Sequence, residues 1–225
     1  MTKKFLKNDP NFRECINIIN KLKIDYWVCH GTLLGIMRDN SLIPWDNDID
    51  IGTWNTPNKE KIIETFIEKG FRHKKKLFGQ NNLISFEKGK NRVIDINFYE
   101  EDKTRKYCFQ RHYAIKNIFC RAIYVLSTAK NYAGRYKSIV NILSFSSNFF
   151  KMIKIMMEKN NLFYIDAGFK TKKFYFKYLK IINYYGIQIK VPIFYKKYFE
   201  DLYGNSWRIP DNKYYWEKNK NKTIL

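Results

Sequence analysis

Three aspartates at alternate positions limit what this chain can fold into. In an extended strand, successive side chains point to opposite faces. A strand over residues 46–53 would therefore turn Asp46, Asp48 and Asp50 to one face and bury Ile49 and Ile51 on the other. Three carboxylates so close together repel one another unless a cation lies between them, and hard oxygen ligands favour Mg²⁺, Mn²⁺ or Ca²⁺. A solvated acidic turn is the competing interpretation.

A turn of small residues precedes the acidic stretch. Residues 24–29 are rich in aromatic and β-branched side chains, which predicts a buried strand. His30, Gly31 and Thr32 then form a turn into a short helix that carries Leu33 and Leu34. Backbone N–H groups at the start of a helix offer a binding place for phosphate.

A fourth aspartate lies in a later predicted strand. Extended segments are expected around Phe71, over residues 83–87 and over residues 92–99. In the last of these, Val93, Asp95 and Asn97 share one face of the strand. A lone aspartate in so apolar a strand is costly unless it has a partner. A metal shared with the earlier aspartates would supply one; a surface position on an edge strand is the alternative.

Strand signals fade after Tyr113, and helices are expected over residues 118–129, 139–157 and 192–203. We therefore expect a catalytic core in residues 1–112 and a helical lobe in residues 113–225 that belongs to the same compact unit. Lys151, Lys154 and Lys159 lie off the apolar stripe of the second helix. That pattern allows contact with an anionic membrane, although packing on the core is the favoured interpretation.

Net charge and cysteine use bear on partners and location. The formal net charge is +21, which favours phosphorylated or other polyanionic partners, but an AT-rich genome would also enrich lysine without selection for a partner. The four cysteines have no metal-type spacing, and the chain begins with charged residues instead of a secretory signal. Together these features predict a cytoplasmic protein with free thiols, able to lie peripherally at the inner membrane face.

The order of these pieces predicts a metal-dependent site that handles phosphate. Asp48 and Asp50 can hold one or two divalent ions that neutralise a diphosphate. Asp95 can complete the second ion's ligands or accept the proton of an attacking hydroxyl. Strand, Gly-Thr turn, paired aspartates and a third strand aspartate match the pattern of polymerase-β-like nucleotidyltransferases. The expected fold is therefore α+β: a nucleotidyltransferase-like mixed β-sheet core flanked by helices, with a mainly helical C-terminal lobe.

Longer motifs resemble the signature of the LicD/fukutin family. The N-terminal part of the signature comprises residues 30–35, Arg38 and residues 43–50. Tyr198, residues 202–204, Trp207 and Pro210 are similar to the family's closing segment. The resemblance implies transfer of a phosphorylated small alcohol, phosphocholine-like, from a CDP-activated donor to a sugar hydroxyl of a cell-surface glycan precursor, such as lipopolysaccharide or capsule, with release of CMP.

The resemblance also implies roles for individual residues. Asp48 and Asp50 would be ligands of Mg²⁺ (or Mn²⁺), with Asp95 as the third carboxylate, and these three would be the catalytic residues. The implied substrate-binding residues are His30, Gly31, Thr32, Arg38 and Asp46. Of these, Gly31 and Thr32 would contact donor phosphate. Position 47 is Asn where many relatives carry Asp.

The remaining substrate-binding residues each keep two interpretations. Arg38 would pair with a phosphate or with Asp46. Asp46 would orient a ligand or a metal-bound water. His30 would bind donor phosphate or fix the turn, and the structural role is favoured.

The implied partners are the CDP-alcohol donor and a glycan or lipid-linked glycan acceptor; nucleic acid is not expected. Two other functions remain open at this point. The chain could be a true nucleotidyltransferase that moves NMP onto a protein, a small molecule or RNA. It could also be a non-catalytic basic module that binds nucleic acid or an anionic membrane.

Overall fold

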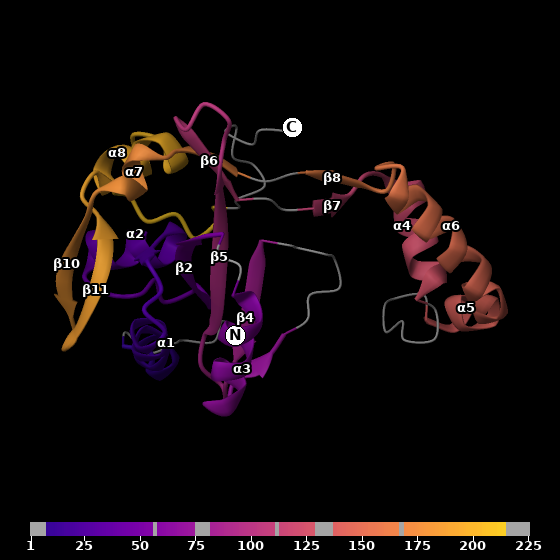
Figure 1. Ribbon diagram of the computed structural model, residues 1–225, viewed down its shortest axis with the longest axis horizontal. Coiled ribbons are helices and arrows are strands. Elements are labelled where there is room, and N and C mark those ends of the chain that lie inside the picture. Colours follow the sequence, from indigo (N-terminus) through magenta and orange to yellow (C-terminus); the bar gives the residue numbers. More distant parts are fainter. Residues whose placement is uncertain are drawn as a thin grey trace. The chain divides into compact units, whose positions relative to one another are not determined.

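The computed structural model describes residues 8–55, 58–74, 82–110, 113–128, 137–166 and 169–214. The described residues form two compact units (Figure 1), one within residues 8–110 and 169–214 and the other within residues 113–166. The sequence predicts a lobe over residues 113–225 within one compact unit, whereas this division separates residues 113–166 alone. Residues 169–214 return to the first unit, because β9 pairs with β6 of the core sheet.

A mixed sheet forms the centre of the first unit, as expected. Its strand order is β1-β2-β5-β4-β3, and β6 extends it from β5 to β9. Strands β2 and β5 are parallel, and the other pairs are antiparallel. The strands are β1 (Tyr26–Val28), β2 (Asp48–Trp54), β3 (Arg72–His73), β4 (Leu83–Glu87), β5 (Val93–Glu101), β6 (Tyr107–Gln110) and β9 (Phe169–Lys172).

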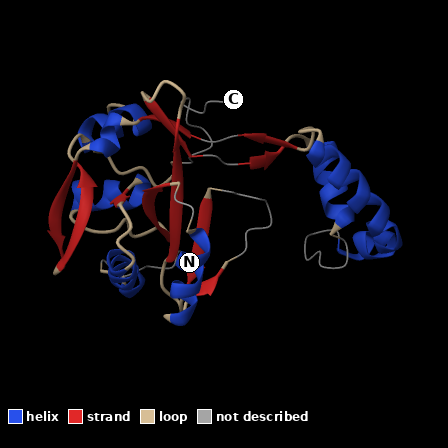
Figure 2. Ribbon diagram, viewed as in Figure 1, coloured by secondary structure: helices blue, strands red, loops and turns tan. Residues whose placement is uncertain are grey.

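Helices and a hairpin accompany this sheet (Figure 2). They are α1 (Pro10–Lys21), α2 (His30–Asp39), α3 (Lys59–Glu68), α7 (Phe174–Lys177), α8 (Tyr195–Tyr203) and the hairpin strands β10 (Leu179–Tyr184) and β11 (Ile187–Pro192). Asp9 caps α1 by accepting a hydrogen bond from the backbone N–H of Asn11 at 2.9 Å, and Pro10 occupies the first turn. The buried face of α1, including Phe12 and Ile16, joins the main hydrophobic core.

The β10–β11 hairpin is absent from the sequence-based assignment. Its signal is the alternation of Ile187, Ile189 and Val191, all buried along β11. The connecting residues Tyr185 and Gly186 have φ angles of 46° and 78°, which suit a two-residue turn between antiparallel strands. A tyrosine at the first of these positions hid the turn, since Asn, Asp or Gly is expected there.

The second unit is small. It contains β7 (Tyr113–Ile115), α4 (Ile118–Ser127), α5 (Lys137–Ile142), the 3₁₀ turn η2 (Leu143–Ser146), α6 (Ser147–Lys159) and β8 (Tyr164–Asp166). Helices α4 and α6 pack side by side around four buried residues, Cys120, Ile123, Tyr124 and Phe163. Among the described residues of the chain, no helix is both long and apolar enough to cross a membrane.

Candidate active site

Two adjacent parallel strands carry three of the predicted aspartates. Asp48 and Asp50 lie on β2, and Asp95 lies on β5. The register places Asp50 directly beside Asp95 and Asp48 beside Val93. Because β2 and β5 are parallel, Asp50 and Asp95 point to the same face of the sheet. The structure thus brings together carboxylates that are 45 positions apart in the sequence.

Asp46 lies outside the strand that the sequence predicts for residues 46–53. β2 begins at Asp48, because the backbone N–H of Asp46 donates to the carbonyl of Ile43 at 3.1 Å and closes a turn before the strand. The carboxylate of Asp46 lies against the Cα of Gly31, where any Cβ would overlap its Oδ2 atom. A side chain at position 31 would therefore displace this carboxylate.

Thr32 is hydrogen-bonded to the backbone of β2. It is buried, and its hydroxyl accepts a hydrogen bond from the backbone N–H of Asp50 at 2.8 Å. Thr32 does not contribute to the lining of the cleft described below, whereas Gly31 does. This placement favours a structural role for Thr32, in which its hydroxyl positions β2. It does not favour the phosphate contact expected from the sequence.

His30 begins α2 with a positive φ of 49° and is held by side chains from three other elements. Its Nε2 lies 3.0 Å from both Gln110 Oε1 and the Tyr99 hydroxyl, and its Nδ1 lies 3.4 Å from the Tyr198 hydroxyl. Burial raises the pKa of both tyrosines well above the usual value, so they remain neutral hydroxyls. These contacts support the structural role favoured for His30, although the residue also lines the cleft.

A hydrogen-bonded relay connects His30 to the carboxylates. Gln110 Nε2 donates to Asn97 Oδ1, and Asn97 Nδ2 donates to Asp50 Oδ1 at 3.0 Å. Asn97 is two residues beyond Asp95 on β5 and therefore faces the same side of the sheet. One oxygen of Asp50 is thus oriented by an amide, which fixes the direction of the other.

A cleft of about 620 Å³ opens over these residues. This volume lies within the range of about 300–1,000 Å³ common for ligand sites. Five aspartates contribute to its lining, Asp46, Asp48, Asp50, Asp95 and Asp211. The opposite wall comes from residues 202–214, among them Tyr203 and Trp207. The two ends of the sequence that carry the family resemblance therefore meet in one cleft.

Arg38 lines the cleft but does not pair with Asp46. Its guanidinium donates to both carboxylate oxygens of Asp39, at 2.9 and 2.7 Å, and to the carbonyl of Trp207 at 3.4 Å. The carboxylate of Asp39, the next residue in the chain, binds the Arg38 guanidinium. The pairing of Arg38 with Asp46, one of the two alternatives from the sequence, is therefore corrected to a pairing with Asp39. The contact with Trp207 links α2 to the C-terminal wall.

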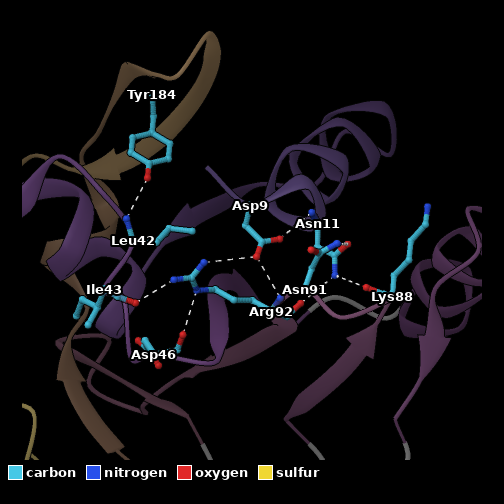
Figure 3. Close-up of polar contacts among 9 residues, drawn as sticks. All are labelled: Asp9, Asn11, Leu42, Ile43, Asp46, Lys88, Asn91, Arg92 and Tyr184. Atoms are coloured by element: carbon cyan, nitrogen blue, oxygen red, sulfur yellow. Dashed lines mark hydrogen bonds and ion pairs between the residues drawn. The ribbon is translucent and has the colours of Figure 1, made fainter. Parts of the chain in front are cut away.

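A buried arginine holds the loop that delivers the aspartates (Figure 3). Arg92 has no exposed surface; its Nη2 donates to the carbonyl of Ile43 at 3.0 Å and its Nε to the carbonyl of Asp46 at 3.1 Å. On the other side of the guanidinium, Nη1 lies 3.5 Å from Asp9 Oδ2, which also accepts from the backbone N–H of Arg92 at 3.1 Å. Burial lowers the pKa of Arg92, and the charge of Asp9 opposes that shift.

The cleft is acidic although the chain is strongly basic. The pKa of Asp46 is raised, first by burial and also by the negative charge of Asp50, while a side-chain hydrogen bond shared with Asp48 and the charge of Arg92 act in the opposite direction. The carboxylates of Asp46 and Asp50 repel each other, and burial leaves Asp46 little water to stabilise its charge. A cation or a proton in the cleft would relieve this repulsion.

No group of three or more His, Cys, Asp or Glu residues is arranged to hold a metal ion among the residues that the structure describes. The cleft nevertheless offers several carboxylate oxygens, the type of ligand that Mg²⁺ and Mn²⁺ prefer. Mg²⁺ commonly uses only one or two protein carboxylates and completes its shell with water and substrate phosphate. Neighbouring Asp50 and Asp95, with Asp48 on the same strand, fit that pattern.

Comparisons with known proteins bear on the family. Residues 23–134 match the family model described as LicD/FKTN/FKRP, nucleotidyltransferase domain. The chain is 38% identical over 88 residues to ribitol-5-phosphate transferase FKTN of Macaca fascicularis, which covers 37% of this chain and 19% of that protein. It is 30% identical over 105 residues to an uncharacterized protein of Rickettsia typhi, covering 46% of this chain and 32% of that protein.

Two further similarities are weaker. Ribitol 5-phosphate transferase FKRP of Homo sapiens is 25% identical over 91 residues, covering 37% of this chain and 18% of that protein. A crystal structure of lincomycin-bound lincosamide antibiotic adenylyltransferase LnuA has a TM-score of 0.44 and 10% identity over 84% of this chain and 81% of that chain. The chain thus spans a third or less of the sequence relatives named here.

The matched residues 23–134 include β1, α2, β2 and β5, the elements that carry the predicted carboxylates and the turn before them. They also include Arg92 and Gln110, which sequence reasoning missed. A charged residue directly before a buried strand was the only available signal for Arg92, and nothing in the sequence singled out Gln110. The chain, with its mixed-sheet nucleotidyltransferase-like fold, belongs to the LicD/fukutin family.

Proposed function

We propose that this protein transfers a phosphorylated small alcohol from a CDP-activated donor to a sugar hydroxyl of a glycan precursor. The observation that carries the proposal is the register pairing of Asp50 with Asp95 in an acidic cleft. Its support from the relatives is that two of them are named ribitol-phosphate transferases. The acceptor in this proposal is a glycan or lipid-linked glycan, such as a lipopolysaccharide or capsule precursor.

The chemistry is the exchange of one phosphoester bond for another. The acceptor hydroxyl oxygen attacks the phosphorus that bears the alcohol, the bond from that phosphorus to the bridging oxygen breaks, and CMP leaves with that oxygen. The hydroxyl proton would pass to a carboxylate, and we propose Asp95 because it lies in the cleft beside Asp50. Catalysis of this kind depends chiefly on position and on charge neutralisation.

Mg²⁺ or Mn²⁺ is part of the proposal, with Asp48, Asp50 and Asp95 as the residues that would hold it. When bound, such an ion would offset the negative charge of the diphosphate and of the departing CMP. Without a cation, an acidic cleft would repel a doubly phosphorylated donor. His30 and Gly31 at the start of α2 would face the donor phosphates, since both line the cleft.

The four cysteines are free thiols, which suits a reducing compartment, and we therefore assign the proposed reaction to the cytoplasm. Trp45 is exposed at the cleft and offers a flat surface for a cytosine ring or a choline head group.

The direct test is release of CMP from CDP-choline, CDP-ribitol, CDP-glycerol and CDP-ethanolamine in the presence of Mg²⁺. The wild-type chain should release CMP from one donor, with loss of activity in Asp50→Asn. Asp25→Asn is the matched control, because Asp25 is exposed and lies outside the cleft lining. Equal activity in wild type and Asp50→Asn would refute the proposal.

A nucleotidyltransferase remains the second candidate, favoured by the domain named in the family match. The two reactions differ in which product keeps the nucleotide. With a donor labelled in the cytidine, the proposed reaction leaves the label in free CMP. Label on a protein, a small molecule or RNA, dependent on Asp50, would establish NMP transfer instead.

A further inference from the structure

Helix α6 carries two apolar stripes with different surroundings. Phe150, Ile153 and Met157 face inward and pack on the small cluster around Phe163. A second stripe runs from the end of α5 through the turn η2 along α6, about 100° around the helix from the first, and is exposed. Its members recur at spacings of three and four residues: Ile142, Phe145, Phe149, Met152 and Met156. We call these five residues the outer stripe.

The outer stripe is unusually open to solvent. Phe145 is 83% exposed, Ile142 74% and Met152 65%. The buried cluster of the second unit has only four members. All five members of the outer stripe are more than half exposed, although Val140 on the preceding helix is buried. Contiguous apolar surface of this kind marks an interaction site in a soluble domain.

Positive charge accompanies the outer stripe. Residues 113–167 contain eight Lys and Arg against two Asp and Glu. Lys151 and Lys159 are exposed on α6, and Lys159 lies beside the stripe, three residues after Met156. The acidic residue of this helix, Glu158, pairs with Lys154 at 3.4 Å. An apolar stripe bordered by lysines has the amphipathic character of a helix that lies in the interface of an anionic membrane.

We infer that the second unit docks on an anionic lipid surface through the outer stripe, with the neighbouring lysines on lipid phosphates. The positive charge beside the outer stripe disfavours a second copy of this chain as the partner that covers it. Self-association through the stripe would bring the lysines of two copies together, within a chain whose net charge is already +21. A surface of anionic lipid presents the opposite charge. The inference does not depend on the proposed transferase activity, because lipid binding is measured without substrate.

The test is co-sedimentation of the full chain with vesicles of phosphatidylcholine alone and of phosphatidylcholine containing a quarter phosphatidylglycerol. Tight binding is expected only to the anionic vesicles. The variant Phe145→Ser/Met152→Ser should weaken that binding by about tenfold, since buried apolar area sets the strength of such contacts. Ile67→Ser/Ile181→Ser is the matched control, because both residues are more than half exposed in the first unit.

A second pair of variants separates charge from insertion. Lys151→Glu/Lys159→Glu should weaken binding to anionic vesicles, whereas Lys103→Glu/Lys196→Glu, also exposed but in the first unit, should not match that loss. Since all these side chains are already in solvent, the variants should fold like wild type, and circular dichroism checks this.

Three results would overturn the inference. The first is equal vesicle binding by wild type and Phe145→Ser/Met152→Ser. The second is loss of binding in both lysine variants alike, which would mean that net charge alone attracts the chain. The third is a dimer in light scattering that Phe145→Ser/Met152→Ser converts to a monomer while wild type fails to bind lipid. That result would assign the outer stripe to a second copy.

Discussion

Replacing Arg92 by Met should destabilise the first unit and loosen the candidate site together. The guanidinium is fully buried between the loop that delivers Asp46 and the cap of α1 at Asp9. Methionine keeps an apolar stem of similar length but donates no hydrogen bond. The carbonyls of Ile43 and Asp46 lose their guanidinium donors, and the Asp9 carboxylate, 1% exposed, loses its neighbouring cation.

The magnitude follows from these losses. Removing one partner of a buried ion pair costs about 3–5 kcal/mol, because the remaining charge stays buried. Each buried carbonyl that loses a partner costs about 1–3 kcal/mol, although entering water can recover part of this. Asp9 still accepts from the backbone N–H groups of Asn11 and Arg92, which puts the cost of the stranded carboxylate at about 3 kcal/mol, and the two carbonyls, partly rehydrated, add about 1 kcal/mol. We therefore expect a loss of about 4 kcal/mol, a large share of the stability of a typical domain, about 5–15 kcal/mol.

The assay is urea unfolding followed by tryptophan fluorescence. The described tryptophans, Trp27, Trp45, Trp54 and Trp207, all lie in the first unit, so fluorescence reports on that unit. With a slope of about 2 kcal/mol per molar urea, the midpoint should fall by about 2 M. Arg92→Lys keeps the charge without the planar fork and should cost less than Arg92→Met.

The double variant Asp9→Asn/Arg92→Met tests the reasoning most sharply. If the cost comes from a stranded carboxylate, neutralising Asp9 should recover about 2 kcal/mol relative to the sum of the single variants. Additive losses would refute the electrostatic part of the explanation. A loss below about 1 kcal/mol for Arg92→Met would refute the role of the guanidinium in holding the loop.

Three other outcomes are expected. Gly31→Ala should lower activity strongly while leaving the chain folded, because its Cβ would displace the carboxylate of Asp46; unchanged activity would contradict that contact. Saturating Mg²⁺ at about 100 times its dissociation constant should stabilise wild type by about 2.7 kcal/mol in thermal unfolding but leave Asp50→Asn unchanged; an equal gain in both would place the ion elsewhere. Burial raises the pKa of Cys15 well above its usual value and that of Cys108 to about 12, so the native chain holds protons that the unfolded chain loses near pH 9. The free energy of unfolding should therefore fall as pH rises past 9, and a thiol reagent should react with these cysteines at pH 8 only after unfolding; rapid reaction of the native chain would contradict their burial.

Periodicity predicted the N-terminal half of the fold well, because each element there has a pattern of its own. The alternation around Asp95 predicted a strand with its aspartate and Asn97 on one face, and β5 confirms both. Residues 179–192 also alternate, yet exposed Ile181 and a Tyr-Gly turn disguised the hairpin. The return of residues 169–214 to the first unit depends on the pairing of β6 with β9, a long-range contact that no local pattern encodes.

The sequence predicted the site residues whose role follows from their residue type. It did not predict the roles that depend on which partner a side chain contacts in the folded chain. Three carboxylates at strand spacing stand out in a sequence because their repulsion needs an explanation. Thr32 and Arg38 appeared in the same motif, but their partners, the backbone of Asp50 and the carboxylate of Asp39, could be found only in the folded chain. A motif thus selects which residues matter without distinguishing those that face the cleft from those that hold it.

The role of Arg92 was also hidden in the sequence, because it depends on contacts made only in the folded chain. An acidic cleft is unfavourable in a folded chain, since its carboxylates repel one another and lose water. The loop before β2 would relieve that repulsion by moving Asp46 outward. Arg92 opposes this motion by binding two carbonyls of the loop, and Asp9 at the cap of α1 offsets the cost of burying the guanidinium. The N-terminal cap is therefore coupled to the position of the carboxylates, and Asp9→Asn alone should weaken Mg²⁺ binding although Asp9 lies outside the cleft lining.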